Sequence, residues 1–167
     1  MNHIVSNLYD YATGVETGLD SNGRKNRVGE QMENLVKKFL IEANVEYFEQ
    51  KYDREVEEMF GLDLSAISAQ RTSNKRFDFV VKGANKIFAI ETNFYTGGGS
   101  KLNETARSYK MLAEESRGID SFVFVWITDG KGWKKTWRNL KETFLILPTL
   151  YNIQDMENGI FRELFND

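Results

Sequence analysis

The chain has 167 residues and a formal net charge of −3, with 41% hydrophobic and 13% aromatic residues. This length fits one domain with a buried core, and the composition is too apolar for a disordered chain. There is no cysteine, and the only histidine is His3, which excludes disulfides, Fe–S clusters and cysteine-based zinc sites and disfavours histidine catalysis. No apolar run is long enough to span a bilayer. An enzyme of this composition would rely on carboxylates, lysines and a hard metal ion, and the lack of cysteine favours the cytoplasm.

The charges are unevenly distributed along the chain. Residues 42–63 carry eight acids against two bases, whereas residues 71–110 carry eight bases against three acids. Residues 131–141 add five bases and no acid. Such asymmetry is typical of a one-sided footprint for a polyanion. The alternative is two ordinary solvated faces.

The first strong helical periodicity lies between Val28 and Ala43. Its apolar face is formed by Val28, Met32, Leu35, Val36, Phe39, Leu40 and Ala43. Asn26 is a possible N-cap for this helix. Glu33 lies on the flank of the apolar face and could reach a neighbouring site, whereas Glu30 points nearly opposite. The alternative for Glu33 is a boundary residue paired with Lys37, four residues later.

The next segments predict a strand from Val45 to Tyr52 and an acidic helical turn over residues 53–60, closed by Gly61. Two β-rich segments, residues 76–81 and 86–94, then flank a turn sequence. A four-residue loop would pair Val81 with Phe88, Phe79 with Ile90, and Asp78 with Glu91, with Asn93 on the face of Glu91.

Opposed residues of a hairpin lie ~5 Å apart at Cβ. Asp78 and Glu91 are therefore predicted to share one oxygen-preferring ion such as Mg²⁺. Such an ion would help water to attack a phosphodiester. The alternative is a pair of acids that are solvated or paired with arginine, because the spacing alone is a weak signal.

Three glycines at residues 97–99 precede a predicted helix from Leu102 to Arg117. Its inward-facing residues are expected to be Leu102, Ala106, Tyr109 and Ala113. Glycine N–H groups beside a helix N-terminus can approach a phosphate closely, although a flexible loop is an equal alternative. Four polar residues follow the glycines: Lys101, Asn103, Glu104 and Arg107. Their side chains suit contacts with phosphates and base edges. The alternative is an ordinary polar helix face with ion pairs.

The C-terminal third predicts a central strand at Ser121–Thr128, buried on both faces. A turn at residues 129–132, a short basic helix at Trp133–Thr143, a last strand at Phe144–Leu147 and a closing helix follow. The three tryptophans are expected to pack in the core more than to stack on bases. The chain is predicted to be one α/β domain with a mixed sheet flanked by helices.

Three blocks of the sequence carry a specific resemblance. They are RKNRVGEQMENLV (24–36), FDFVV…AIETNFYTGGGSKLNETARSYK (77–110) and VWITDGKGW (125–133). Together they closely resemble the DpnII/MboI family of type II restriction endonucleases. The resemblance implies a restriction-endonuclease-like PD-(D/E)xK core, dependence on Mg²⁺ and a homodimer. It also implies cleavage of double-stranded DNA at unmethylated GATC, on the 5′ side of the G, with no membrane association and no small-molecule cofactor.

The resemblance also assigns residues. Asp78 and Glu91 take the places of the two motif acids and would ligate the metal, Asn93 stands where the general motif has lysine, and Lys101 is the candidate substitute. Glu33 corresponds to the helix glutamate that supports such sites. The glycine run and the polar side chains behind it supply the predicted DNA contacts: Gly98, Gly99, Ser100, Lys101, Asn103, Glu104 and Arg107.

Members of the family are longer at the N-terminus, so residues 1–167 are expected to form a single nuclease domain that lacks this portion. Two alternatives to a GATC-specific enzyme stay open at this point. One is a repair or mobile-element nuclease of the same fold with another specificity. The other is a truncated DNA-binding remnant that no longer cleaves.

Overall fold

The computed structural model describes residues 21–68, 72 and 74–166, with side chains from Val28 onward. Five strands form one sheet in the order β1-β2-β3-β4-β5. Their bounds are Glu46–Tyr52, Arg76–Lys82, Ile87–Phe94, Phe122–Asp129 and Leu150–Tyr151. The first three strands pair antiparallel, whereas β3–β4 and β4–β5 are parallel. The sheet is therefore mixed, as the sequence predicted.

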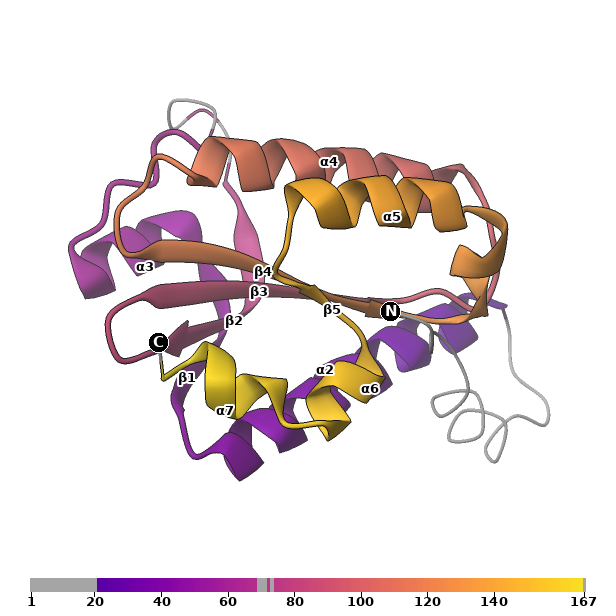
Figure 1. Ribbon diagram of the computed structural model, residues 1–167, viewed down its shortest axis with the longest axis horizontal. Coiled ribbons are helices and arrows are strands. Elements are labelled where there is room, and N and C mark those ends of the chain that lie inside the picture. The colour runs from indigo at the N-terminus through magenta and orange to yellow at the C-terminus, as the bar shows by residue number, and fades with distance from the viewer. Residues whose placement is uncertain (1–20, 69–71, 73, 167) are drawn as a thin grey trace.

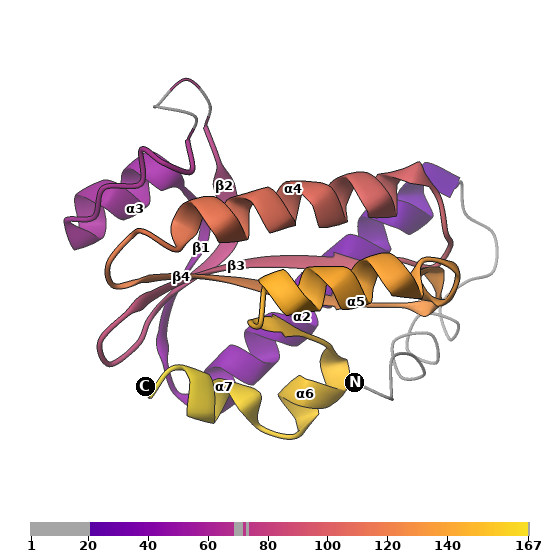
Figure 2. The same cartoon turned by 45° about the horizontal axis from the view of Figure 1, so that its top comes forward.

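Helices cover both faces of this sheet (Figure 1). On one face lie α4 (Ser100–Ser116) and α5 (Trp137–Ile146), and on the other lie α2 (Ser21–Ala43), α6 (Ile153–Glu157) and α7 (Ile160–Leu164). The short helix α3 (Asp53–Phe60) follows β1 and contributes Val56 to the core on the α4 side. Figure 2 shows α4 and α5 running side by side over the sheet, and they are in contact. These layers confirm the predicted α/β architecture.

Alternation along β3 and β4 divides the core into two halves. Ala89 and Trp126 pack under α4, whereas Ile90 and Val125 pack against α2 on the opposite face. Both strands are buried on two sides, which explains their nearly continuous apolar sequence. Glu91 interrupts this pattern as a charged residue inside the sheet.

The ladder between β1 and β2 is irregular at one point. Glu49 pairs with Phe79 and Lys51 pairs with Phe77, but the intervening Gln50 and Asp78 are not joined as a pair. Gln50 has a positive φ of 53°, which is unusual for a residue other than glycine. Phe77 packs on the α4 side although alternation from Phe79 would place it on the other. Asp78 therefore lies in β2 at the point where the regular pairing with β1 is interrupted.

Most predicted elements are confirmed. The hairpin pairs Val81 with Phe88 and Phe79 with Ile90, and Gly83 N–H donates to the Lys86 carbonyl across the loop. The α3 helix ends at Gly61, whose φ is 67°. The four predicted inward residues of α4 are all buried: Leu102, Ala106, Tyr109 and Ala113.

Four expectations are wrong. The α2 helix begins at Ser21, so Asn26 lies inside it and is not its cap. The predicted helix at Trp133–Thr143 is instead a 3-10 turn at Lys131–Lys135 followed by α5. Residues 144–147 are not a strand, because α5 continues to Ile146 and the last strand comes after Pro148. The closing helix is two short helices, broken where Gly159 takes a φ of 89°.

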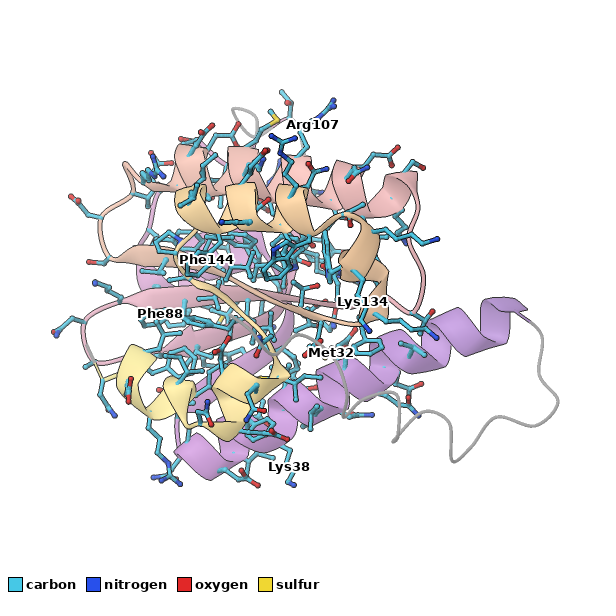
Figure 3. All side chains as sticks on the ribbon, turned by 45° about the vertical axis from the view of Figure 1, so that its right-hand side comes forward. Met32, Lys38, Phe88, Arg107, Lys134 and Phe144 are labelled. Atoms are coloured by element: carbon cyan, nitrogen blue, oxygen red, sulfur yellow. The ribbon has the colours of Figure 1, made fainter. Side chains whose placement is uncertain are left out.

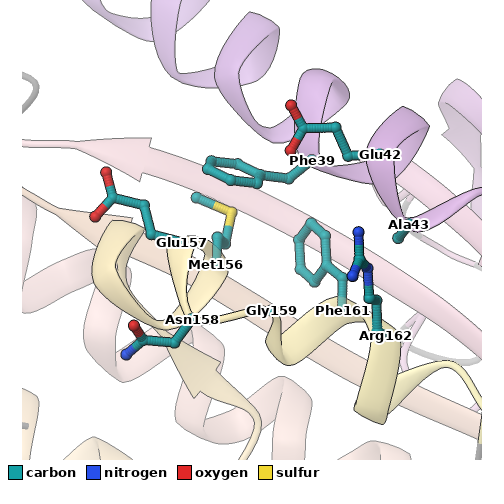
Figure 4. Close-up of a pocket in the computed structure, with 9 residues that line it drawn as sticks. All are labelled: Phe39, Glu42, Ala43, Met156, Glu157, Asn158, Gly159, Phe161 and Arg162. Atoms are coloured by element: carbon teal, nitrogen blue, oxygen red, sulfur yellow. The ribbon is translucent and has the colours of Figure 1, made fainter.

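A pocket of ≈ 220 Å³ lies between the end of α2 and the α6–α7 segment (Figure 4). It is lined by Phe39, Glu42, Ala43, Met156, Glu157, Asn158, Gly159, Phe161 and Arg162. None of these is a predicted site residue, so the pocket is separate from the predicted metal ligands Asp78 and Glu91. His3 lies outside the described residues, and within them no helix has the length and apolar character needed to cross a membrane.

Candidate active site

Glu91 is the most deeply buried carboxylate among the predicted site residues, at 8% exposure on β3. The Tyr109 hydroxyl, from α4, donates to its Oε2 at 2.9 Å. The Lys75 ammonium lies 3.0 Å from its Oε1. Burial raises the pKa of Glu91 above its ordinary value, and the charge of Lys75 opposes that rise. This carboxylate is therefore held between an aromatic hydroxyl and a cation.

Asp78 lies beside it on β2 and is half-buried. Its Oδ2 accepts two bonds from Thr92, one from the backbone N–H at 2.8 Å and one from Oγ1 at 3.0 Å. The negative charge of Asp78 raises the pKa of both Glu33 and Glu91. The structure therefore brings Asp78 close enough to Glu91 to act on it electrostatically. The paired residues of β2 and β3 end at Phe79 and Ile90, so the predicted direct pairing of Asp78 with Glu91 is not part of the ladder.

Glu33 approaches the same neighbourhood from α2. Gln50 Nε2 donates to its Oε2 at 3.0 Å. Partial burial raises the pKa of Glu33, and Asp78 adds to that rise. The alternative pairing with Lys37 is wrong, because the Lys37 ammonium lies 2.6 Å from Glu49 on β1 instead. Gln50 links Glu33 to the irregular point of the ladder opposite Asp78.

Asn93 is half-buried near the end of β3. Its Oδ1 accepts a hydrogen bond of 2.8 Å from the indole Nε1 of Trp126, on the neighbouring strand β4. Trp126 is fully buried, so its N–H needs a partner inside the protein. The amide oxygen of Asn93 therefore has a structural task, and the position carries no positive charge.

The predicted DNA-contacting residues gather at the start of α4, and all are exposed: Gly98, Gly99, Ser100, Lys101, Asn103, Glu104 and Arg107. Arg107 points outward from α4, away from the sheet (Figure 3). Lys101 lies eight residues before Tyr109, which is about 12 Å along a helix axis. Lys101 belongs to this outer face, whereas Tyr109 reaches the buried carboxylate.

The glycine segment is anchored on both sides. Tyr95 N–H donates to the Asp129 carbonyl at 3.0 Å, and Gly132 N–H donates to the Tyr95 carbonyl at 2.8 Å. The Tyr95 hydroxyl reaches Thr105 Oγ1 in α4 at 2.9 Å. The space where a side chain would stand at Gly97 or Gly99 is open. The segment thus presents backbone to solvent from a fixed position, and α4 begins there without a side-chain cap at its first N–H groups.

Three residues of the site were missed by sequence reasoning. Lys75 precedes β2, and its position three residues before Asp78 was the only local signal. Tyr109 was expected to be buried, but its hydroxyl bond to Glu91 was not foreseen. Gln50 gave no signal, since its role depends on its φ and on Glu33.

The oxygens of Asp78 and Glu91 fit a hard divalent ion. Glu91 Oε1 is buried, and within the described part of the chain it forms an ion pair with the Lys75 ammonium at 3.0 Å. Within residues 21–68, 72 and 74–166, no three acidic or histidine side chains are grouped as an ion-binding set. Substrate, water or backbone oxygens would have to complete the coordination.

A mixed sheet between helices, with two acids on adjacent strands at its middle, is a restriction-endonuclease-like α/β architecture. The family model described as DpnII restriction endonuclease matches residues 1–163. The chain belongs to this family.

Curated relatives agree with that assignment. The type II restriction enzyme DpnII of Streptococcus pneumoniae is 55% identical over 98% of this chain and 58% of its own length. The type II restriction enzyme MboI of Moraxella bovis is 40% identical over 93% of the chain and 53% of its own length. The type II restriction enzyme MjaIII of Methanocaldococcus jannaschii is 39% identical over 98% and 58%. The chain thus spans little more than half the length of these relatives, and no solved structure matches it significantly.

Proposed function

We propose that this chain is the catalytic domain of a Mg²⁺-dependent type II restriction endonuclease that hydrolyses double-stranded DNA at unmethylated GATC. The observation that carries the proposal is the buried Glu91, in electrostatic contact with Asp78 inside the sheet. A buried carboxylate with a raised pKa costs stability, and such groups are concentrated at functional sites. Membership of the DpnII family supports nuclease chemistry as the function.

In this proposal, Asp78 and Glu91 hold the ion. Thr92 fixes Asp78 through two bonds, and Tyr109 fixes Glu91 through one. When bound, Mg²⁺ would polarise the scissile phosphate and offset the negative charge of the transition state. Glu33, held by Gln50, assists from the α2 side of Asp78. Together these residues hold the carboxylates in place beside the phosphate whose phosphorus water would attack.

The DNA would lie against the start of α4. The open glycine segment, the exposed polar residues from Gly98 to Arg107 and the neighbouring Lys135 all belong to this surface, since Lys135 packs beside Gly98. Uncapped N–H groups at a helix start favour anions. Lys101 and Arg107 would contact phosphates or guanine, and Asn103 and Glu104 would read base edges.

A GATC site is the same on both strands, which favours a homodimer with one catalytic domain for each strand. Because the proposed substrate is DNA, we expect the protein to act in the cytoplasm. Residues 1–167 would act as one nuclease domain, and the described strands support this because they form a single sheet.

The proposal is tested with two preparations of one plasmid, one with adenine-methylated GATC sites and one without. Each is incubated with the protein, with Mg²⁺ and with EDTA. We expect fragments that end at GATC from the unmethylated plasmid in Mg²⁺ alone. Fragments with other ends would favour a nuclease of different specificity. Retarded but uncut plasmid would favour a DNA-binding remnant, and either result would overturn the proposal.

A further inference from the structure

The ammonium that pairs with Glu91 comes from outside the two strands that bear Asp78 and Glu91. Lys75 ends the segment before β2, and its ammonium lies 3.0 Å from Glu91 Oε1. The same ammonium stands 5.1 Å from the centre of the Tyr109 ring. Lys75, Glu91 and Tyr109 therefore form one cluster in which every pair is in contact.

The backbone of Lys75 is held in place at both its N–H and its carbonyl. Asp53 N–H donates to the Lys75 carbonyl at 2.8 Å, and Lys75 N–H donates to Asp53 Oδ2 at 3.2 Å. Asp53 is 1% exposed and begins α3. A buried acid 22 residues away in sequence thus fixes the point from which the lysine side chain extends. The position is built into the fold.

We infer that Lys75 supplies the positive charge of this active site, acting beside Glu91 on the phosphate that is cleaved. The inference rests on the proposed function and adds a residue to it. Neither of the other candidates is placed for this role. Asn93 accepts a bond from Trp126 and is uncharged, and Lys101 stands on the outer face of α4, about 12 Å along the helix from Tyr109.

The energetics favour a functional role over a structural one. The Glu91 side chain is nearly buried and that of Lys75 is partly exposed. An ion pair that loses much of its hydration adds little net stability, so stability gives little reason for this pair. An ammonium fixed next to a metal-binding carboxylate is close to where negative charge develops on the phosphate oxygens. A preorganised cation at such a point stabilises the transition state more than the bound substrate. Lys75 is therefore expected to affect the rate of cleavage more than DNA binding.

The first experiment compares Lys75→Met with Lys82→Met. Lys82 ends β2, the strand that Lys75 precedes, and is exposed beside Glu46, so it controls for the loss of one lysine charge. Single-turnover cleavage of an unmethylated GATC duplex is measured in Mg²⁺, and duplex binding is measured in Ca²⁺ by fluorescence anisotropy. We expect Lys75→Met to cleave at least about 100-fold more slowly, with binding changed by less than about threefold. Lys82→Met should match the unsubstituted protein in both.

Lys75→Arg separates charge from packing. Arginine keeps the positive charge at this position, so its cleavage should be at least about tenfold faster than that of Lys75→Met. If Lys75→Arg is as slow as Lys75→Met, or if Lys75→Met cleaves at the unsubstituted rate, the inference is wrong. Equal losses in cleavage and binding would make Lys75 a DNA contact and would also overturn it.

A second readout needs neither DNA nor cleavage. If Lys75 and the ion both bind Glu91, removing the ammonium leaves Glu91 with an unpaired negative charge, which Mg²⁺ can neutralise. Mg²⁺ should therefore raise the melting temperature of Lys75→Met more than that of the unsubstituted protein or of Lys82→Met. Equal Mg²⁺-induced shifts in all three would contradict the inference. If the unsubstituted protein cuts no DNA, the proposed function fails, whereas the melting experiment still tests whether Lys75 and the ion share Glu91.

Discussion

Thr92 binds the carboxylate of Asp78 twice, through its backbone N–H at 2.8 Å and through its hydroxyl at 3.0 Å. Thr92 directly follows Glu91 on β3, so the residue next to one acid orients the other. Both bonds end on Oδ2. Two adjacent residues of β3, Glu91 and Thr92, thus supply one of the acids and the donors that orient the other.

Thr92→Val should loosen this arrangement. Valine has the same shape and keeps the backbone donor, but it removes the hydroxyl bond to a charged acceptor, which is worth about 1.5 kcal/mol. We expect urea unfolding to give a free energy of unfolding lower by about that amount, and cleavage to be slower by about tenfold. Thr92→Ser retains the hydroxyl and should stay close to the unsubstituted protein. If the valine and serine variants behave alike, the hydroxyl does not position Asp78.

The raised pKa of Glu91 predicts a specific dependence of stability on pH. In the folded protein this carboxyl holds its proton above the ordinary pKa of 4.5, mainly because it is buried. Folding therefore takes up a proton between pH 4.5 and the raised pKa, and the contribution of Glu91 to stability falls as pH rises through that interval.

The measurement compares the unsubstituted protein with Glu91→Gln, which cannot titrate. Free energies of unfolding in urea, without divalent ions, are determined from about pH 4 to about pH 8. The difference, unsubstituted protein minus Glu91→Gln, should decrease with rising pH and then level off. A difference that increases with pH would mean that the pKa of Glu91 is lowered.

The bond from Trp126 to Asn93 predicts a coupling between these two residues. Asn93→Ala leaves a buried indole N–H without its acceptor, which should cost about 1–3 kcal/mol of stability. In a Trp126→Phe background the donor is absent, so the same change should cost little. A double-mutant cycle by urea unfolding measures this difference. Cleavage by Asn93→Ala should stay within about tenfold, and a much larger loss at unchanged stability would assign Asn93 a direct role in the chemistry.

The sequence was sufficient for the hairpin because local signals agree there. Loop length and alternation determine the register as far as Phe79 and Ile90. Asp78 lies just beyond these pairs, where the β1–β2 ladder is irregular, and still acts electrostatically on Glu91. The failed strand at residues 144–147 shows the limit of such signals. Its apolar residues look β-forming, but Leu140, Thr143 and Leu147 are the ones buried, at helical spacing, whereas Leu145 is 76% exposed. Packing against α4 therefore decided the outcome.

Lys75 was beyond sequence reasoning for a different reason. Its contact with Glu91 depends on the two hydrogen bonds between Asp53 and the backbone of Lys75 and on the position of α4 over the sheet. Both are contacts between residues far apart in the sequence. The strand that follows Lys75 was correctly predicted, but no periodicity says where a side chain before a strand will point. Carboxylates on paired strands were therefore predictable, and their partners from other elements were not.

The glycine segment offers a comparison of two alanine substitutions. A Cβ at Gly99 meets no atom within 4 Å, and its φ of 164° suits any residue. Gly99→Ala should therefore change stability by less than about 0.5 kcal/mol. A phosphate against this backbone would nevertheless be displaced, so duplex affinity in Ca²⁺ should fall by at least about tenfold.

Gly132→Ala is the contrasting case. Its Cβ would lie 2.5 Å from the Gly97 carbonyl oxygen, so backbone must move. We expect a loss of about 1–3 kcal/mol by urea unfolding. Unchanged DNA affinity in Gly99→Ala would show that the glycine segment does not contact the duplex.

The central claim is that Asp78 and Glu91 hold the ion with which this domain cleaves GATC. Asp78→Asn tests it most directly, because asparagine keeps the shape and an oxygen that can accept from Thr92 while removing the charge. Glu58→Gln, at an exposed acid of α3, is the control. The measurement is single-turnover cleavage of an unmethylated GATC duplex in Mg²⁺. The account predicts that Asp78→Asn is slower by at least about 1,000-fold while Glu58→Gln is unchanged, and cleavage by Asp78→Asn at the unsubstituted rate would contradict it.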